Sequence, residues 1–142
     1  MSDEPGLTIL LVDDDDVAAE SVVRSLQRAQ LDLPVVWAED GAVALEILRG
    51  GDSLRRAPRP RVVLLDLNMP HMDGFEFLRQ LRLDRELREE VVFVLTTSDI
   101  DTDRIRAYHE NIAGYMVKAL VGPQFSRLAS LLASYRSAVT LP

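Results

Sequence analysis

Apolar positions divide the chain into five short runs that alternate with longer stretches of helical periodicity. The runs are rich in valine, isoleucine and leucine, which is typical of strands buried on both faces of a parallel sheet. They lie at residues 7–12, 34–38, 62–66, 91–96 and 114–117.

The stretches between the runs carry apolar residues at the spacing of one helix face. They predict five helices, one starting near Asp16 and the others over residues 42–49, 73–83, 101–112 and 123–137. Asp73 is suited to the N-cap of the third helix and Pro123 to the first turn of the fifth. Five alternating strand–helix units predict an α/β fold, in which helices cover both faces of a parallel sheet.

Four of the runs end at a chemically distinctive residue. The first run stops at the aspartates Asp13–Asp16 and the third at Asp66. The fourth stops at Thr96 and the fifth at Lys118. Ligands of open α/β sheets bind beyond the carboxyl ends of the strands, so these residues are the candidates for a functional site.

Composition narrows the class of protein. The 142 residues suit a single domain over 1–142, with a core of about 7–137 and no output domain. A formal net charge of −7 argues against binding to nucleic acid or to anionic membranes. The lack of cysteine excludes disulfides, zinc–thiolate sites and thiol catalysis. Because the sequence has neither a secretory signal nor an apolar run of membrane-spanning length, the expected location is cytoplasmic.

The acidic strand ends predict a metal site. If the first and third strands are neighbours, Asp13, Asp14 and Asp66 converge at one edge of the sheet. Two carboxylates about 4 Å apart repel by roughly 4 kcal/mol at an effective dielectric constant of about 20, so three together need a cation. Mg²⁺ is the natural candidate, with Mn²⁺ as an alternative, because it prefers hard oxygen ligands. Asp15 and Asp16 are expected to face solvent or to cap the first helix.

Thr96 and Lys118 add a hydroxyl and an ammonium group to this edge. Carboxylates, a metal, a hydroxyl and an ammonium group are together the parts of a phosphoryl-transfer site. The aspartate run alone would be read as an acidic helix cap, and it is Asp66 at the neighbouring strand end that favours a site. Elsewhere, Trp37 is predicted to belong to the core. The basic segment Gly50–Arg61 is read as a solvated loop, with a docking surface as the alternative.

These motifs resemble the receiver domain of two-component response regulators. The resemblance covers about residues 7–137 and implies a flavodoxin-like, doubly wound five-stranded parallel sheet of strand order 2-1-3-4-5 with five helices. The arginine-bearing loop is similar to that of stand-alone regulators paired with phytochrome-type kinases. The matching segments are Asp13-Asp14, Ala38-Glu39-Asp40-Gly41, Asp66-Leu67-Asn68-Met69-Pro70, Asp73-Gly74, Thr96-Thr97-Ser98, Gly114-Tyr115 and Lys118.

The resemblance implies the phosphorylation and metal residues. Asp66 would accept a phosphoryl group from a sensor histidine kinase. Asp14 would ligate Mg²⁺ directly, with Asp13 assisting through water. Asp66 itself and the backbone carbonyl of Asn68 would complete the protein ligands.

It also implies the residues that respond to phosphorylation. Thr96 would bond a phosphoryl oxygen, Lys118 would pair with the phosphoryl group, and Tyr115 would turn inward when Thr96 moves. One position departs from the family, which usually has proline after the lysine, often behind a cis peptide bond. Here Ala119 follows, so either a strained cis bond or a different loop path is expected.

The implied output is a change in the face formed by the fourth helix, the fifth strand and the fifth helix. That face would bind a downstream target, pass the phosphoryl group to a phosphotransfer protein, or form a homodimer, without direct contact to nucleic acid or membrane. The chain would not be an enzyme beyond catalysing its own Mg²⁺-dependent phosphorylation and dephosphorylation.

Two alternatives remain open. One is an aspartyl-phosphate phosphatase of the haloacid dehalogenase kind, although the Asp-x-Asp-x-Thr motif of that family is missing after the first strand. The other is a degenerate receiver that acts as a binding adaptor, which the joint presence of Asp14, Asp66, Thr96 and Lys118 argues against.

Overall fold

The computed structural model describes residues 6–69, 72–122 and 125–142. Pro70 of the third motif and the predicted helix-starting Pro123 lie outside these ranges. The strands are β1 (Thr8–Val12), β2 (Val35–Ala38), β3 (Arg61–Leu65), β4 (Val92–Thr96) and β5 (Gly114–Val117). The helices are α1 (Asp16–Arg28), α2 (Gly41–Leu48), α3 (Gly74–Leu83), α4 (Asp101–His109) and α5 (Ser126–Ala138), with a 3₁₀ helix, η1, over Lys118–Leu120.

The strands form one parallel sheet in the order β2-β1-β3-β4-β5. This confirms the predicted flavodoxin-like topology, with five α-helices in the described part of the chain. Element boundaries agree closely, with α4 as the clearest exception. It ends at His109 rather than at the predicted residue 112, and Asn111 then adopts a left-handed backbone conformation (φ 59°), which does not continue a helix.

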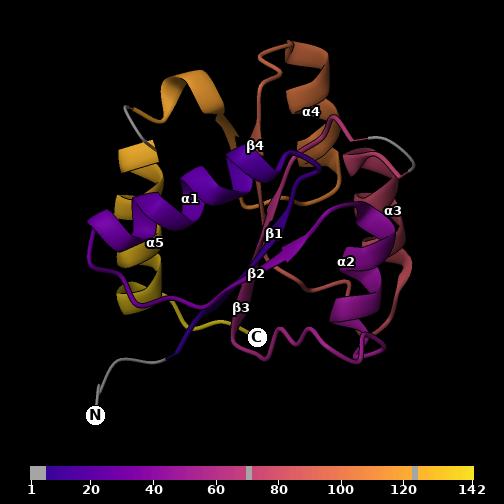
Figure 1. Ribbon diagram of the computed structural model, residues 1–142. Coiled ribbons are helices and arrows are strands. Elements are labelled where there is room, and N and C mark those ends of the chain that lie inside the picture. The colour runs from indigo at the N-terminus through magenta and orange to yellow at the C-terminus, as the bar shows by residue number, and fades with distance from the viewer. Residues whose placement is uncertain (1–5, 70–71, 123–124) are drawn as a thin grey trace.

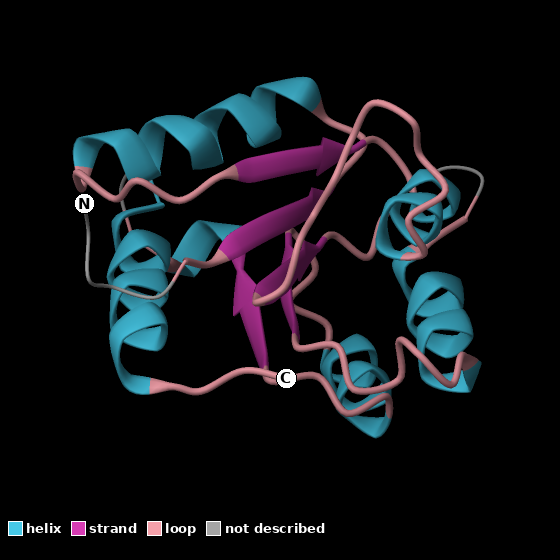
Figure 2. Cartoon of the chain, turned by 90° about the horizontal axis from the view of Figure 1, so that it is seen from below, coloured by secondary structure: helices cyan, strands magenta, loops and turns pink. Residues whose placement is uncertain are grey.

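Alternate strand residues face two separate helical layers. Ile9 and Leu11 pack with α1 and α5 on one face, whereas Leu10 and Val12 pack with α2, α3 and α4 on the other. Figures 1 and 2 show the sheet between these two layers. Burial of both faces explains why the strands read as continuous apolar runs instead of alternating patterns.

Aspartates begin the helices that follow the first three strands. Asp15 caps α1 by accepting a hydrogen bond from the backbone N–H of Val17 at 2.9 Å. Asp40 caps α2, and Asp73 caps α3, as predicted for Asp73. Only part of the Asp13–Asp16 run therefore serves the helix end, which leaves Asp13 and Asp14 for another role. No helix within the described ranges is long and apolar enough to cross a membrane.

The basic segment Gly50–Arg61 is less solvated than predicted. Arg61 is buried at the start of β3, where its guanidinium pairs with the buried carboxylate of Glu90 and donates to the carbonyl of Ala57 at 2.9 Å. Arg59 adds a longer contact of 3.5 Å to the same carboxylate. The reading as a solvated loop was thus wrong for Arg61, because its acidic partner lies far along the sequence.

Replacement of Glu90 by glutamine should destabilise the fold, because it leaves the buried guanidinium of Arg61 without a counter-charge. We expect the free energy of unfolding in urea to fall by about 3 kcal/mol. The matched control is Glu89→Gln, which removes the neighbouring, exposed charge and should stay within about 0.5 kcal/mol of wild type. Equal effects of the two substitutions would contradict a stabilising role for the buried pair.

Candidate functional site

The sheet register brings the acidic strand ends together. Val12 at the end of β1 pairs with Leu65 at the end of β3, so the next residues, Asp13 and Asp66, leave the sheet at the same edge. The backbone N–H of Asp66 donates to the carbonyl of Val12 at 2.9 Å and fixes this alignment one residue beyond the strands. The neighbouring strands predicted from the run-ends are therefore present.

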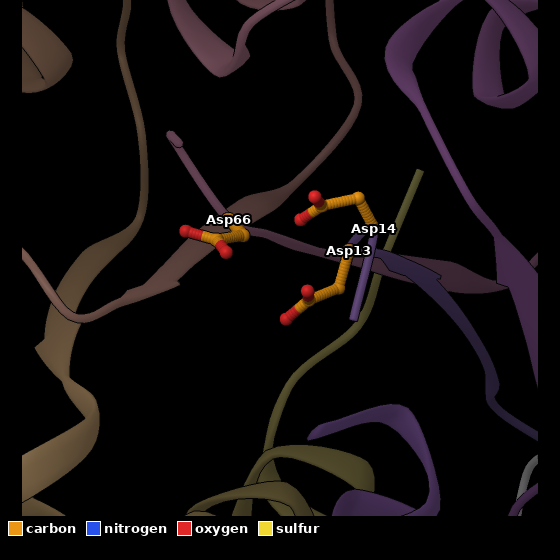
Figure 3. A group of neighbouring side chains, drawn as sticks. All are labelled: Asp13, Asp14 and Asp66. Carbon is orange, nitrogen blue, oxygen red and sulfur yellow. The ribbon is translucent and has the colours of Figure 1, made fainter. Parts of the chain in front are cut away.

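Three carboxylates meet at this edge. One oxygen each from Asp13, Asp14 and Asp66 lies within 4.8 Å of the others. Figure 3 shows Asp13 and Asp14 at consecutive positions after β1, with their carboxylates directed toward the side on which Asp66 lies. Asp13 and Asp66 are buried and Asp14 is exposed, so the cluster opens to solvent on one side.

Lys118 supplies the positive charge of the cluster. Its Nζ lies 2.9 Å from Oδ2 of Asp13 and 3.5 Å from Oδ2 of Asp66. Burial alone would lower the pKa of Lys118, but the hydrogen bond and charge of Asp13, together with the charge of Asp66, raise that pKa above its ordinary value. The pKa of Asp13 is also raised, because burial outweighs the stabilisation from Lys118. One ammonium group therefore compensates the crowded carboxylates only in part.

The loop after β3 is shaped by a glycine. The backbone N–H of Gly74 donates to the carbonyl of Leu67 at 3.0 Å, which places the start of α3 against the Asp66–Leu67 backbone. A Cβ atom on Gly74 would lie 2.6 Å from Cα of Leu67 and 2.8 Å from the carbonyl oxygen of Asp66. The carboxylate of Asp66 also accepts a hydrogen bond from the N–H of Asn68 at 3.2 Å. Gly74 thus sets how closely α3 approaches the central carboxylate.

Thr96 and Tyr115 meet the same loop, the one after β4. Thr96 is fully buried at the end of β4, and its hydroxyl accepts a long hydrogen bond from the N–H of Ser98 at 3.4 Å. The phenol of Tyr115 donates to the carbonyl of Ser98 at 2.9 Å, and the hydroxyl of Ser98 donates to Asp103 in α4 at 2.7 Å. Burial raises the pKa of Tyr115, so the phenol keeps the proton that it donates. Strand β5 is therefore linked through Ser98 to the start of α4.

The chain after Lys118 follows a different loop path and has no strained cis peptide bond at Ala119. Among the described residues the one cis peptide bond joins Arg59 and Pro60, so the Lys118–Ala119 bond is trans. The chain continues from β5 directly into the 3₁₀ turn of η1. Alanine at position 119 is compatible with that turn, and Lys118 still reaches the carboxylates.

Trp37 lies beside the site and not in the core, where its residue type had placed it. It was predicted to be a core residue, but 38% of it is exposed on the edge strand β2. Its indole N–H donates to the backbone carbonyl of Asp13 at 2.7 Å. The expected strand order already places the second strand at the edge of the sheet, but the contact of the indole with Asp13 joins residues 24 positions apart, and no local residue pattern signals it.

Comparison with known sequences identifies the family. The sequence profile of the response regulator receiver domain matches residues 9–129. This chain belongs to the response regulator receiver domain family. That membership confirms the predicted receiver function, and the Asp13–Asp14–Asp66 cluster fits the phosphoacceptor site of such domains.

Two relatives match across most of their length. A probable methanogenesis regulatory protein of Methanothrix harundinacea, FilR2, is 38% identical over 136 residues, which cover 93% of this chain and 84% of that protein. The response regulator Rcp1 of Synechocystis sp. is 32% identical over 145 residues, with 100% of this chain and 99% of that protein covered. Receiver domains of this family take phosphoryl groups from histidine kinases.

Solved structures agree in fold with this chain. The Mn²⁺-bound form of Rcp1 matches with a TM-score of 0.81 at 31% identity, covering 97% of this chain and 99% of that one. The phosphorylated cyanobacterial phytochrome response regulator RcpA matches with a TM-score of 0.84 at 29% identity, with the same shares covered. The acidic cluster and the Mn²⁺-bound neighbour together support binding of a divalent metal.

Replacement of Gly74 by alanine should perturb the Asp66 loop, because the new methyl group meets backbone atoms that cannot move without shifting the loop. We expect a loss of about 1–3 kcal/mol in the free energy of unfolding in urea. Gly6→Ala is the control, since a Cβ at Gly6 meets nothing within 4 Å. Wild-type stability of Gly74→Ala would show that the close approach of α3 is not required.

Proposed function

We propose that Asp66 accepts a phosphoryl group from a sensor histidine kinase with the help of bound Mg²⁺. The observation that carries the proposal is the convergence of Asp13, Asp14 and Asp66 within 4.8 Å beside Lys118. At that separation each pair of ionised carboxylates repels by about 3 kcal/mol at an effective dielectric constant of about 20. A divalent cation would remove this cost.

Among the three carboxylates, Asp66 is the best placed nucleophile. Both oxygens of Asp13 are held at 2.9 Å, one by the N–H of Asp15 and the other by Lys118. The contacts of Asp66 are longer, at 3.2 Å to the N–H of Asn68 and 3.5 Å to Lys118. Asp66 also follows β3, the strand that neighbours β4 and its terminal Thr96. These differences support Asp66 as the acceptor and Asp13 as a fixed partner.

The remaining groups support a division of labour. Asp14 faces solvent and would ligate the cation directly, Asp13 would assist through water, and Asp66 and the carbonyl of Asn68 would complete the protein ligands. This donor set is made of hard oxygen atoms, which suits Mg²⁺. When bound, the cation supplies positive charge to the transferred oxygens.

The transfer itself requires a nucleophilic oxygen and a leaving imidazole. An oxygen of Asp66 would form a bond to phosphorus while the bond from phosphorus to the histidine nitrogen of the kinase breaks, and that nitrogen keeps the bonding electrons. Lys118 would then pair with the new phosphoryl group, and the hydroxyl of Thr96 would donate to one of its oxygens. Hydrolysis of the acyl phosphate would return the chain to its starting state, so it would catalyse only its own phosphorylation and dephosphorylation.

The response would leave the site through Tyr115. Its hydrogen bond to Ser98 and the bond from Ser98 to Asp103 connect β5 with α4, so movement of Thr96 toward a phosphoryl group would reach both elements. The face formed by α4, β5 and α5 would then change its affinity for a downstream target, for a phosphotransfer protein or for a second copy of the chain. Similarity to Rcp1 and RcpA supports a stand-alone regulator of 1–142 that works with a phytochrome-type kinase.

Incubation with Mg²⁺ and acetyl phosphate tests the proposal. The wild-type chain should gain one phosphoryl group, seen by mass spectrometry and lost in base or hydroxylamine, whereas Asp66→Asn should gain none. Asp16→Asn, which changes an exposed aspartate in the first turn of α1, is the control and should react like wild type. Absence of an adduct on wild type with any donor would favour a degenerate receiver, and multiple turnover of phosphate esters would favour a phosphatase.

Lys118→Ala should separate phosphorylation from its consequence. Lys118 is the only lysine of the chain, and it joins the acidic cluster to the end of β5. The variant keeps the three carboxylates and should still accept a phosphoryl group, but amide hydrogen exchange in the loop after β4 should no longer change on phosphorylation. Lys118→Arg keeps the charge and serves as the comparison. A wild-type exchange response in Lys118→Ala would contradict the coupling role.

A further inference from the structure

Trp37 joins the edge of the sheet to the acidic cluster. It lies on β2, the edge strand, where it pairs in register with Leu11. Its indole N–H donates to the backbone carbonyl of Asp13 at 2.7 Å, which is shorter than the two 2.9 Å hydrogen bonds to the carboxylate of Asp13. It is also the only tryptophan of the chain.

The backbone of Asp13 is consequently held from β2 at two points. Its N–H donates to the carbonyl of Ala38 at 3.1 Å, and its carbonyl accepts from the indole of Trp37. The carbonyl of Asp13 and the N–H of Asp14 belong to one planar peptide unit. A bond that fixes this carbonyl therefore fixes the plane from which the side chain of Asp14 departs.

The loop after α2 holds Trp37 in turn. Nη1 of Arg55 donates to the carbonyl of Trp37 at 3.2 Å and to the carboxylate of Glu39 at 2.9 Å. Nη2 of the same guanidinium lies 3.1 Å from Asp52. An edge strand presents unpaired carbonyls to solvent, and Arg55 occupies one of them directly at the tryptophan. The arginine-bearing loop thus clamps the strand that carries the indole.

We propose that Trp37 is a positioning residue for the divalent cation site, and that Arg55 supports it. The indole N–H fixes the Asp13–Asp14 peptide so that the exposed carboxylate of Asp14 is presented to the cation. Without this bond the Asp13–Asp14 peptide would rotate more freely. Part of the binding free energy of the cation would then be spent on ordering that peptide. This inference rests on the proposed function, since it concerns the metal ligands named there.

The size of the effect follows from one hydrogen bond. Loss of a single bond of this kind corresponds to about a threefold to tenfold change in an equilibrium constant. The change should appear in the dissociation constant for the cation, because the pre-ordered backbone reduces the cost of binding. Stability should change less, because Trp37 lies at an exposed edge rather than in the core.

Cation affinity of the full chain tests the proposal. Mg²⁺ and Mn²⁺ are titrated separately by isothermal calorimetry into wild type, into Trp37→Phe and into a chain carrying β-(3-benzothienyl)alanine at position 37. The analogue keeps the shape of the indole and replaces its N–H by sulfur, so it removes the donor without emptying space. Both variants should bind each cation about threefold to tenfold more weakly. The exposed Tyr108→Phe is the aromatic control and should bind like wild type.

A second pair of variants tests the clamp. Arg55→Lys keeps the charge, but its single ammonium cannot reproduce the fork that reaches the carbonyl of Trp37, Glu39 and Asp52 together. It should weaken cation binding in the same direction by a smaller factor. Arg56→Lys makes the same chemical change at the adjacent exposed arginine and should leave the affinity unaltered.

The outcomes separate this inference from the proposed function. If the wild-type chain binds the cations and both the benzothienyl variant and Trp37→Phe bind them with the same affinity, the positioning role alone is overturned. A wild-type chain that binds neither cation would overturn the metal site together with this inference. Backbone ¹⁵N spectra without metal give a further readout, since the Asp14 amide signal should shift in the benzothienyl variant at unchanged melting temperature. An unshifted Asp14 signal would also contradict the positioning role.

Discussion

Electrostatic repulsion between Asp13, Asp14 and Asp66 is the constraint that the rest of this structure has to satisfy. Their oxygens approach within 4.8 Å, and two of the three residues are buried. Three carboxylates and the single ammonium of Lys118 leave two negative charges when all are ionised. A divalent cation would balance that remainder, and the same positive charge would stabilise a transferred phosphoryl group.

The fold imposes this proximity through its backbone. Adjacent parallel strands that are buried on both faces cannot slip relative to one another without exposing apolar side chains, so the register that places Asp13 beside Asp66 is strongly fixed. Gly74 allows α3 to lie close to the loop that carries Asp66. The side chain of Asp15 accepts a hydrogen bond from the N–H of Val17, and this cap holds the chain in place directly after Asp14. The positively charged side chain of the cluster is the only lysine of the chain, and every other basic side chain apart from histidine is arginine. A compact ammonium on a flexible stem can exchange a carboxylate for a phosphoryl oxygen more readily than a planar guanidinium bound at two points.

Much of this arrangement could be predicted from the sequence because strand ends and ligand positions coincide in open α/β sheets. The run-ends at Asp13, Asp66, Thr96 and Lys118 needed only the assumption that the first and third strands are neighbours. What could not be predicted depends on contacts between residues distant in sequence. The buried pair of Arg61 and Glu90 joins residues 29 positions apart, and the hydrogen bond from Trp37 to Asp13 joins residues 24 positions apart, so no local pattern signals either contact.

The same reasoning explains the outcome at position 119. The resemblance left two expectations for the Lys118–Ala119 bond, a strained cis peptide or a different path of the loop. The second requires that the chain after β5 turns without proline. The 3₁₀ turn of η1 provides that path and still directs Lys118 toward Asp13. Alanine at position 119 is therefore compatible with the pairing of Lys118 and Asp13.

Chemical trapping of the phosphoryl group tests most directly whether the three carboxylates have different roles. Borohydride reduces an aspartyl phosphate to homoserine, and peptide mass spectrometry then locates the reduced residue. After reaction with Mg²⁺ and acetyl phosphate, this account predicts homoserine at position 66 alone. Homoserine at position 13 or 14, with Asp66 unchanged, would contradict it.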